Sequence, residues 1–248
     1  MRTDLLVFTA AFLTTIASMP VYALTGAWRT RDPLESATRG SFVLGGFVRA
    51  WFYWLISPIV RTSLALGLSP LFYNLAGVAF GIAAGAAFAL GNPVLGGWSV
   101  LAGGIADILD GRIARARGIA SPKGAFLDST LDRFAEVGAF VGLAVWFQTR
   151  PLLIVLVALA LGGSLLVSYT RARGESQGVL CNKGIMQRAE RLLLIGFGGI
   201  LDPAVSGWVR RDPGALLAAV VTLVAIGTVA TAIYRTVWIA RRLPDHQV

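Results

Sequence analysis

The chain has 248 residues, of which 56% are hydrophobic and only 14% carry a charged side chain. An ordinary soluble domain has about 25% charged residues, so this composition excludes that class and places the chain among membrane proteins. The net charge of +9 suits an anionic membrane surface or an anionic substrate, and because no nucleic-acid-binding motif is present we expect no nucleic-acid partner.

The N-terminal part of the chain predicts an extra helix followed by a linker. Residues 5–24 form an apolar stretch that either spans the membrane or lies on its surface. Residues 25–40 are polar and contain proline and glycine, which is typical of a linker. We therefore assign residues 1–40 to an N-terminal extension.

Residues 41–62 predict an amphipathic helix that lies in the membrane interface. Four consecutive aromatic residues stand between Arg49 and Arg61, and aromatic side chains beside Arg are typical of this depth. We expect the helix to stop near Pro58. The start of a spanning helix would fit the same residues.

Six apolar segments predict membrane-spanning helices within residues 63–242. Most of them begin at a proline, which is favoured in the first turn of a helix. The segments cover residues 70–90, 93–115, 122–147, 151–171, 183–201 and 213–235. Gly77, Gly81 and Gly85 recur on one face of the first segment and predict close helix packing. The predicted fold is an all-α integral membrane protein, a six-transmembrane-helix bundle with an N-terminal interfacial amphipathic helix.

Basic residues at the predicted helix ends are divided unevenly between the two sides of the bundle. The poor side has Arg150, Arg210 and Arg211. The rich side has Arg112, Arg115, Arg117, Lys123, Arg171, Arg173, Lys183, Arg188, Arg191, Arg241 and Arg242. Because cytoplasmic loops carry the excess of Lys and Arg, we expect the rich side to face the cytoplasm from the inner membrane.

Four aspartates lie around the loop between the second and third predicted spans. Asp107 and Asp110 are three residues apart and Asp128 and Asp132 are four apart, so each pair shares one helix face. The short loop lets the two helices run antiparallel, which brings the four carboxylates together. At this depth they could be protonated, pair with Arg or bind cations. Mg²⁺ prefers carboxylate oxygens and shares them with substrate phosphates, so the group predicts a metal site for a diphosphate.

The segment 107–132 resembles the CDP-alcohol phosphatidyltransferase family, whose motif is D-x2-D-G-x2-A-R-x8-G-x3-D-x3-D. All eight fixed positions are matched with no gap, by Asp107, Asp110, Gly111, Ala114, Arg115, Gly124, Asp128 and Asp132. A match of this length is specific where shorter motifs are weak. The family has a six-helix fold, which agrees with the six spans predicted here, and it implies a homodimer.

The resemblance also implies an activity and a role for each matched residue. It implies a Mg²⁺- or Mn²⁺-dependent enzyme with two ions, which transfers a phosphatidyl group from CDP-diacylglycerol to a small alcohol and releases CMP. The metal ligands would be Asp107, Asp110, Asp128 and Asp132, and Asp132 would also be the catalytic base for the acceptor hydroxyl. The CDP pocket would be lined by Gly111, Ala114, Arg115 and Gly124.

A second basic cluster is predicted on the cytoplasmic side, and it consists of Arg171, Arg173, Arg188 and Arg191. Anchoring to lipid headgroups would account for it. A pocket for an acceptor that carries a phosphate would account for it as well, because Arg makes bidentate contacts with phosphate. Glu175 and Glu190 lie between these residues and indicate organised pairing.

The same region resembles the bacterial phosphatidylinositol-phosphate synthases, in which the pattern S-Y-x-K-A-R-A-E is followed by E-R-x-E-R. This chain differs from the pattern at Arg171, Gly174 and Gln187. The resemblance implies inositol phosphate as the acceptor, while glycerol phosphate, serine and free inositol stay open. A membrane transporter or scaffold with aspartates on an ion path is the non-enzyme alternative. An ion path does not need the fixed Gly, Ala and Arg positions, and prenyl transferases space their aspartates differently.

Overall fold

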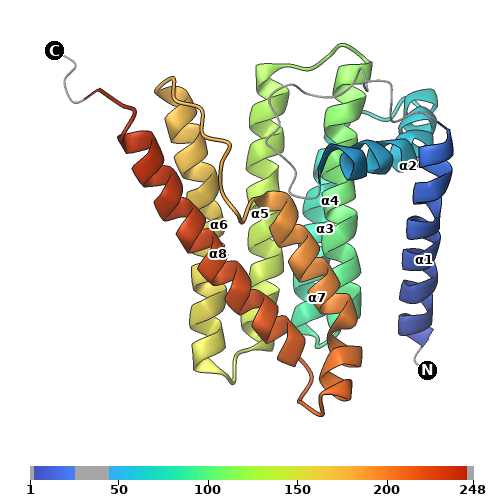
Figure 1. Ribbon diagram of the computed structural model, residues 1–248, viewed down its shortest axis with the longest axis vertical. Helices are drawn as coiled ribbons and strands as arrows, with labels where there is room; N and C mark the ends of the chain where they lie inside the picture. The colour runs from blue at the N-terminus through green and yellow to red at the C-terminus, as the bar shows by residue number, and fades with distance from the viewer. Residues whose placement is uncertain (1–2, 26–44, 245–248) are drawn as a thin grey trace.

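The computed structural model describes residues 3–25 and 45–244, and within these ranges it contains eight helices and no strand (Figure 1). The helices are α1 Thr3–Leu24, α2 Gly45–Ala65, α3 Pro70–Ala89, α4 Pro93–Ala116, α5 Pro122–Trp146, α6 Pro151–Ser176, α7 Arg188–Trp208 and α8 Ala215–Ala240. Nearly all of the predicted linker, and the first residues of the predicted interfacial helix, lie outside the described residues.

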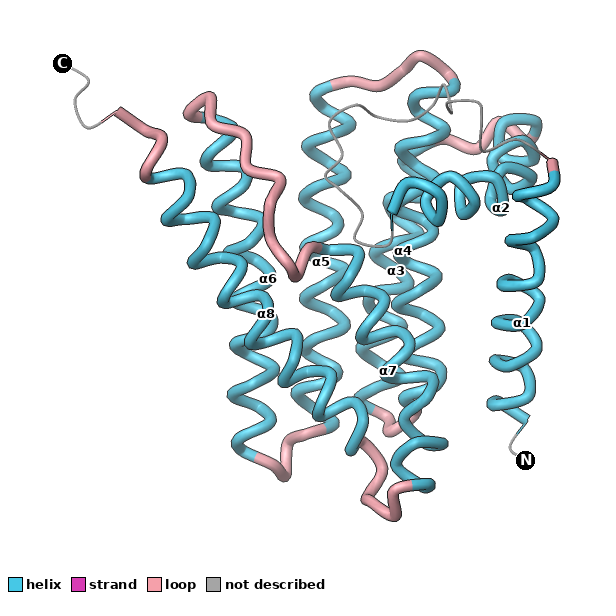
Figure 2. Tube along the Cα trace, viewed as in Figure 1, coloured by secondary structure: helices cyan, strands magenta, loops and turns pink. Residues whose placement is uncertain are grey.

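Helices α3 to α8 form a bundle in which successive helices run in opposite directions (Figure 2). Helix α3 packs against both α4 and α5, α4 packs against α7, and α6 packs against α8. Helix α2 runs across the long axis of the bundle, at the end where α4 passes to α5 (Figure 1). The connection between α6 and α7 descends from that end toward the middle of the bundle, so α7 begins deep in the molecule.

The helix starts of the bundle follow from local sequence. Prolines occupy the first turns of α3, α4, α5 and α6, where a missing N–H costs no hydrogen bond. Ser69, Asn92 and Ser121 each precede one of these prolines, and their side chains accept hydrogen bonds from backbone N–H groups in the first turn. These features confirm that four of the predicted segments begin a helix at the expected proline.

The predicted stop of the interfacial helix near Pro58 is wrong, because α2 continues through this proline to Ala65. A proline inside a helix costs about 3 kcal/mol. Ile56 and Val60 flank Pro58 and are buried against α3 and α4. Burial of an aliphatic side chain contributes roughly 1.5–3 kcal/mol, so the two together offset the proline.

The predicted start of the fifth span at Lys183 is also wrong, because α7 begins at Arg188. Gly184 has a φ of +140°, a backbone conformation that cannot continue a helix. Met186 donates its N–H to the Thr231 hydroxyl, and the Lys183 carbonyl accepts a hydrogen bond from Arg235. These bonds to α8 hold residues 177–187 as a non-helical connection.

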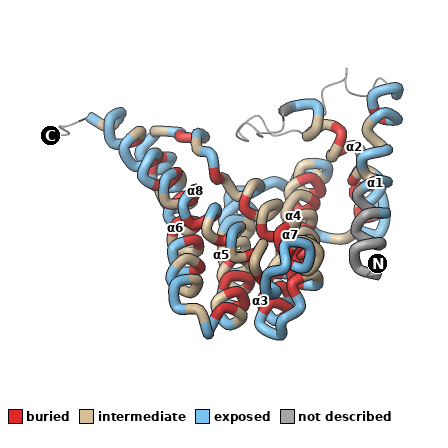
Figure 3. The backbone as a smooth tube through the Cα atoms, turned by 60° about the horizontal axis from the view of Figure 1, so that its bottom comes forward, coloured by how far each residue is buried: buried red, intermediate tan, exposed pale blue. Residues whose placement is uncertain are grey.

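Exposed residues lie along the outward faces of the bundle helices (Figure 3), and many of them are large and hydrophobic, as a lipid environment requires. Exposed large hydrophobic residues include Leu75 and Ile82 on α3, Val155 and Leu159 on α6, and Ile226 and Ile233 on α8. By length and composition, α3, α4, α6 and α8 could each cross a membrane. The chain is therefore an α-helical integral membrane protein.

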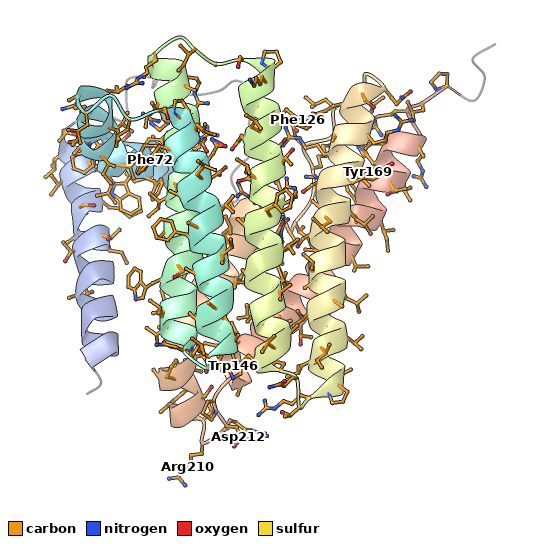
Figure 4. The ribbon with its side chains drawn as sticks, turned by 180° about the vertical axis from the view of Figure 1, so that it is seen from behind. Phe72, Phe126, Trp146, Tyr169, Arg210 and Asp212 are labelled. Carbon is orange, nitrogen blue, oxygen red and sulfur yellow. The ribbon has the colours of Figure 1, made fainter. Side chains whose placement is uncertain are left out.

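Aromatic and charged side chains lie near the ends of the bundle (Figure 4). Exposed aromatic residues Phe126 and Tyr169 lie toward the end that holds the α4–α5 loop. At the opposite end, Asp212 lies beside Arg210 and forms an ion pair with Arg150. Trp146 also lies at this end, so aromatic residues occur near both ends of the bundle, which suits a bundle whose apolar middle lies in the bilayer (Figure 4).

Glycines allow α3 and α5 to approach backbone to backbone. A Cβ at Gly81 would overlap the backbone of Ala135, and a Cβ at Gly85 would overlap the Gly138 carbonyl. A Cβ at Gly142 would overlap the backbone of Gly85. The predicted packing role of the glycine face is confirmed at these positions, and it fixes α5, which carries two of the four aspartates.

Gly142→Ala is expected to lower the melting temperature of the detergent-solubilised protein by roughly 2–12 °C. Overpacking against a backbone that cannot retreat costs about 1–3 kcal/mol. Gly162→Ala is the matched control, because nothing lies within 4 Å of a Cβ added there. Equal melting temperatures for the two variants would contradict the packing role.

Candidate functional site

A short turn places the two aspartate-bearing helix ends beside each other. Gly118, just past the end of α4, has a φ of +66°, which favours glycine after a helix. Ser121 then caps α5 by accepting a hydrogen bond from the Gly124 N–H at 3.2 Å. The last turns of α4 and the first turns of α5 consequently face the same space.

Three of the four predicted aspartates converge there. One carboxylate oxygen from each of Asp107, Asp110 and Asp128 lies within 4.8 Å of the other two. Asp110 is buried and its two neighbours are partly buried. Three hard oxygen donors at this spacing fit Mg²⁺ or Mn²⁺, which accept few protein carboxylates and leave positions for substrate phosphates.

Asn74 orients one of these aspartates, and sequence reasoning missed it. Its side-chain amide donates to Asp110 Oδ2 at 3.1 Å and also to the Pro70 carbonyl. Groups that hold a ligand carboxylate in place tune a metal site. An amide in an otherwise apolar helix is a signal that could have drawn attention to this residue.

The residues predicted to line the CDP pocket lie on the two helices that flank this turn. A Cβ at Gly111 would lie 3.1 Å from Arg115 Nη1, so the guanidinium lies over the glycine. A larger side chain at this position would displace Arg115. Ala114, next to Arg115 on the helix, is partly exposed, and Gly124 is exposed in the first turn of α5.

Arg188, the first residue of α7, joins the two aspartate helices. Its Nη1 lies 2.7 Å from Asp107 Oδ1 on α4, and its Nη2 lies 2.6 Å from Asp132 Oδ1 on α5. The fourth predicted aspartate, Asp132, is thus held by an arginine at the edge of the three-aspartate cluster. The side chain of Arg188 is 24% exposed, so it remains accessible from the site.

A second pair lies one helical turn deeper. Arg191 contacts Glu136 Oε1 through Nε and Nη2, each at 2.9 Å, and Arg133 lies 3.5 Å from the other carboxylate oxygen. Arg191 is 1% exposed. Arg191 therefore lies beneath the predicted phosphate pocket and holds α7 against α5. The sequence predicts it as a ligand of the acceptor phosphate and does not predict this contact.

A small cavity of about 40 Å³ lies directly below the upper pair, between α3, α4, α5 and α7. Its polar lining comes from Ser99, Asp132, Glu136, Arg188 and Arg191. The space is large enough for about two or three water molecules. The cavity below the site therefore has a mainly apolar lining that contains a few polar side chains from the two pairs.

The remaining arginines of the predicted acceptor cluster lie on the last turns of α6. Arg171 forms an exposed ion pair with Glu175 at 2.8 Å, so this part of the predicted pairing is present. Arg173 is exposed. The structure does not bring these two residues into contact with the Arg188 group.

Two further arginines position parts of the site and were missed as such. Arg112 is buried, with its guanidinium 4.5 Å from the centre of the Tyr53 ring, and this contact joins α2 to the motif helix. Arg235 donates to the carbonyls of Lys183 and Val167, both at 2.8 Å. It fixes the segment that leads into Arg188, and a charge inside the apolar last span was the available signal.

The chain is similar to one family of known proteins over most of its length. A family model described as CDP-alcohol phosphatidyltransferase matches residues 56–231. A phosphatidylinositol phosphate synthase of Streptomyces avermitilis is 34% identical over 222 residues, which are 86% of this chain and 88% of that protein. An archaetidylinositol phosphate synthase of Methanothermobacter thermautotrophicus is 37% identical over 191 residues, 75% of this chain and 93% of that protein.

Solved structures of a phosphatidylinositol phosphate synthase from Mycobacterium tuberculosis have a similar fold. The structure with CDP-DAG bound has a TM-score of 0.67 and 28% identity, and the match covers 77% of this chain and 98% of that one. The structure in complex with manganese and citrate has a TM-score of 0.65 and 30% identity, and covers 74% and 88% of the two chains.

Proposed function

This chain belongs to the CDP-alcohol phosphatidyltransferase family, and we propose that it transfers a phosphatidyl group from CDP-diacylglycerol to inositol phosphate with release of CMP. The observation that carries the proposal is the convergence of Asp107, Asp110 and Asp128 within a motif matched at every fixed position. The proposed cofactor is Mg²⁺ or Mn²⁺, as two ions, and the manganese complex of the mycobacterial relative supports it.

The metal site consists of the three converging aspartates. A divalent cation bound there neutralises the diphosphate and stabilises CMP as a leaving group. Gly111 leaves room for the guanidinium of Arg115, which lies over it and contacts a phosphate oxygen. Ala114 and Gly124 complete the CDP pocket because their small side chains leave room for the nucleotide.

Asp132 removes the proton from the acceptor hydroxyl. The hydroxyl oxygen forms a bond to the phosphorus that carries the diacylglycerol, and the bond from that phosphorus to the CMP oxygen breaks. Asp132 lies one helical turn from Asp128, so its carboxylate borders the metal cluster without being one of the three closest donors. Asp132 leaves the step protonated, and CMP carries the bonding electron pair away.

Arg188 binds the phosphate of the acceptor, supported by Arg171 and Arg173 at the cytoplasmic entrance. The guanidinium of Arg188 lies between the three-aspartate cluster and the small cavity, within reach of a group placed beside Asp132. Arg191 contributes through Arg188, because its pair with Glu136 fixes the first turn of α7.

The proposed membrane arrangement has six spans, α3 to α8, in the inner membrane with the active site facing the cytoplasm. Helices α5 and α7 are included because their charges pair inside the bundle. Helix α2, Gly45–Ala65, takes the place of the interfacial amphipathic helix predicted for residues 41–62. Residues 1–40 are the N-terminal extension, and residues 63–242 are the catalytic domain. The apolar outer faces leave room for a second copy, in line with the homodimer implied by the family.

An acceptor panel tests this function. Purified protein with CDP-diacylglycerol and Mg²⁺ is expected to release CMP with inositol phosphate at a kcat/KM at least about tenfold above that with glycerol phosphate, serine or free inositol. A higher value with another acceptor would reassign the substrate and keep the reaction. No CMP with any acceptor, together with ion flux in proteoliposomes, would favour the transporter alternative.

Arg188→Ala in the same panel is expected to lower kcat/KM for inositol phosphate by about 10- to 100-fold, since a hydrogen bond to a charged group contributes roughly 1.5–3 kcal/mol. Free inositol, which has no phosphate, should lose much less. Arg150→Ala removes a charge at the opposite end of the bundle and serves as the control. Equal losses with both acceptors would argue against a phosphate contact.

A further inference from the structure

Arg188 contacts both a member of the three-aspartate cluster and the proposed base, so it competes with a metal ion for the same carboxylate. Its Nη1 lies 2.7 Å from Asp107 Oδ1, and Asp107 belongs to the three-aspartate cluster that fits a divalent cation. Its Nη2 lies 2.6 Å from Asp132, the proposed base. A guanidinium this close to Asp107 opposes a divalent cation at the same carboxylate, through like charge and shared space.

Repulsion among the carboxylates explains why a positive charge is needed at this place. Four carboxylates at the bundle end repel one another when no cation lies among them, and leaving such groups unpaired in a partly buried site is costly. Arg188 approaches from a third helix and supplies a positive charge to one carboxylate on α4 and one on α5 at once. It has the geometry of an internal substitute for a bound cation.

We propose that Arg188 is an exchangeable counter-cation, which neutralises Asp107 and Asp132 until the metal binds and is then released toward the acceptor phosphate. The second half of this inference rests on the proposed function. Metal binding and acceptor binding are thereby coupled through one side chain, and Asp132 loses its arginine partner when the acceptor arrives.

The surroundings of Arg188 let the side chain move while the helix stays in place. One turn below, Arg191 is 1% exposed and is held by Glu136 and by the Met186 carbonyl. Above, Arg235 and Thr231 fix the segment that precedes α7. Arg188 itself is 24% exposed and is the first residue of α7, so its guanidinium can exchange partners without a shift of the backbone.

Coupling between two binding sites changes both affinities by the same factor, so the proposal makes a numerical prediction for metal and phosphate binding. If the metal frees Arg188 for a phosphate, then the phosphate must raise the affinity for the metal by the same factor. If the guanidinium occupies the aspartates for most of the time, the apparent metal affinity is reduced by the fraction of time in which the site is open. Removing the guanidinium therefore strengthens metal binding even as it weakens acceptor binding.

Calorimetric titration of the purified protein with Mn²⁺, without lipid donor or acceptor, tests the first half. Arg188→Ala and the milder Arg188→Gln are expected to bind Mn²⁺ about tenfold more tightly than the wild type, corresponding to a site open roughly a tenth of the time. Arg150→Ala, which removes the same charge far from the aspartates, should leave the affinity unchanged. Unchanged or weaker Mn²⁺ binding in both Arg188 variants would overturn the exchange.

Titration with inositol phosphate in the presence and absence of Mn²⁺ tests the coupling. The wild type is expected to bind this probe at least about fivefold more tightly with Mn²⁺, and Arg188→Ala is expected to lose the dependence on metal. A dependence that survives in Arg188→Ala would overturn the coupling. These readouts need no turnover, so a tighter Mn²⁺ site in a protein that makes no CMP would refute the proposed function alone.

Discussion

Asp128→Asn is expected to lower kcat/KM for CMP release at least about 1,000-fold. Asp128 is the member of the three-aspartate cluster that α5 contributes, whereas Asp107 and Asp110 both come from α4. Replacing one carboxylate oxygen by an amide nitrogen removes a donor that hard cations require. Metal stabilisation of the transition state amounts to several kcal/mol, and each 1.36 kcal/mol changes the rate tenfold.

Two measurements separate a damaged site from a damaged fold. The affinity for Mn²⁺ in Asp128→Asn should fall together with turnover, while the melting temperature of the metal-free protein should stay equal or rise, because one repelling charge is removed. Asp212→Asn is the matched control, since Asp212 is exposed and pairs with Arg150 at the opposite end of the bundle. Full turnover in Asp128→Asn would refute the assignment of the metal site.

The aspartate cluster was predictable because its chemistry is local in sequence. Asp107, Asp110 and Asp128 lie on two consecutive helices joined by a short turn, and helical spacing fixes which faces they share. The turn itself has readable signals in Gly118 and Ser121. The same locality explains why four helix starts were correct.

The contacts that complete the site join residues far apart in the sequence, so the spacing of hydrophobic residues does not predict them. Arg188 and Asp132 are 56 positions apart, Arg191 and Glu136 are 55 apart, and Asn74 and Asp110 are 36 apart. Such pairs depend on how α3, α4, α5 and α7 meet, which hydrophobic patterning leaves undetermined. The sequence showed the cluster of basic residues. Only the structure shows that Arg188 contacts the aspartates while Arg191 lies deeper and pairs with Glu136.

Buried charge also limits how well hydropathy identifies the six proposed membrane-spanning helices. Four helices pass as apolar segments, while α5 and α7 carry acids and arginines that pair inside the bundle. Asp202 on α7 is one such residue, fully buried, and it accepts hydrogen bonds from the N–H groups of Gly214 and Leu217. It stabilises the start of α8, so a buried acid in this chain is not by itself a sign of chemistry.

Asp132→Asn is expected to reduce kcat by about 100- to 10,000-fold while leaving the Mn²⁺ affinity within about threefold of the wild type. The loss is the range that a positioned general base contributes. Metal binding should persist because the three closest donors, Asp107, Asp110 and Asp128, are untouched. The contrast with Asp128→Asn, which should lose both properties, is what assigns different roles to two acids one helical turn apart.

The experiment compares Mn²⁺ titration with single-turnover CMP release at saturating metal, again with Asp212→Asn as the control. Asparagine at 132 can still accept a hydrogen bond from Arg188, so the bridge between α5 and α7 is preserved and the melting temperature should change little. If Mn²⁺ affinity falls as far as in Asp128→Asn, then Asp132 is a fourth metal ligand and the proton must leave by another route. If affinity holds and kcat falls, the carboxylate beside the cluster is the group that takes the acceptor proton, and its release from Arg188 becomes a condition for turnover.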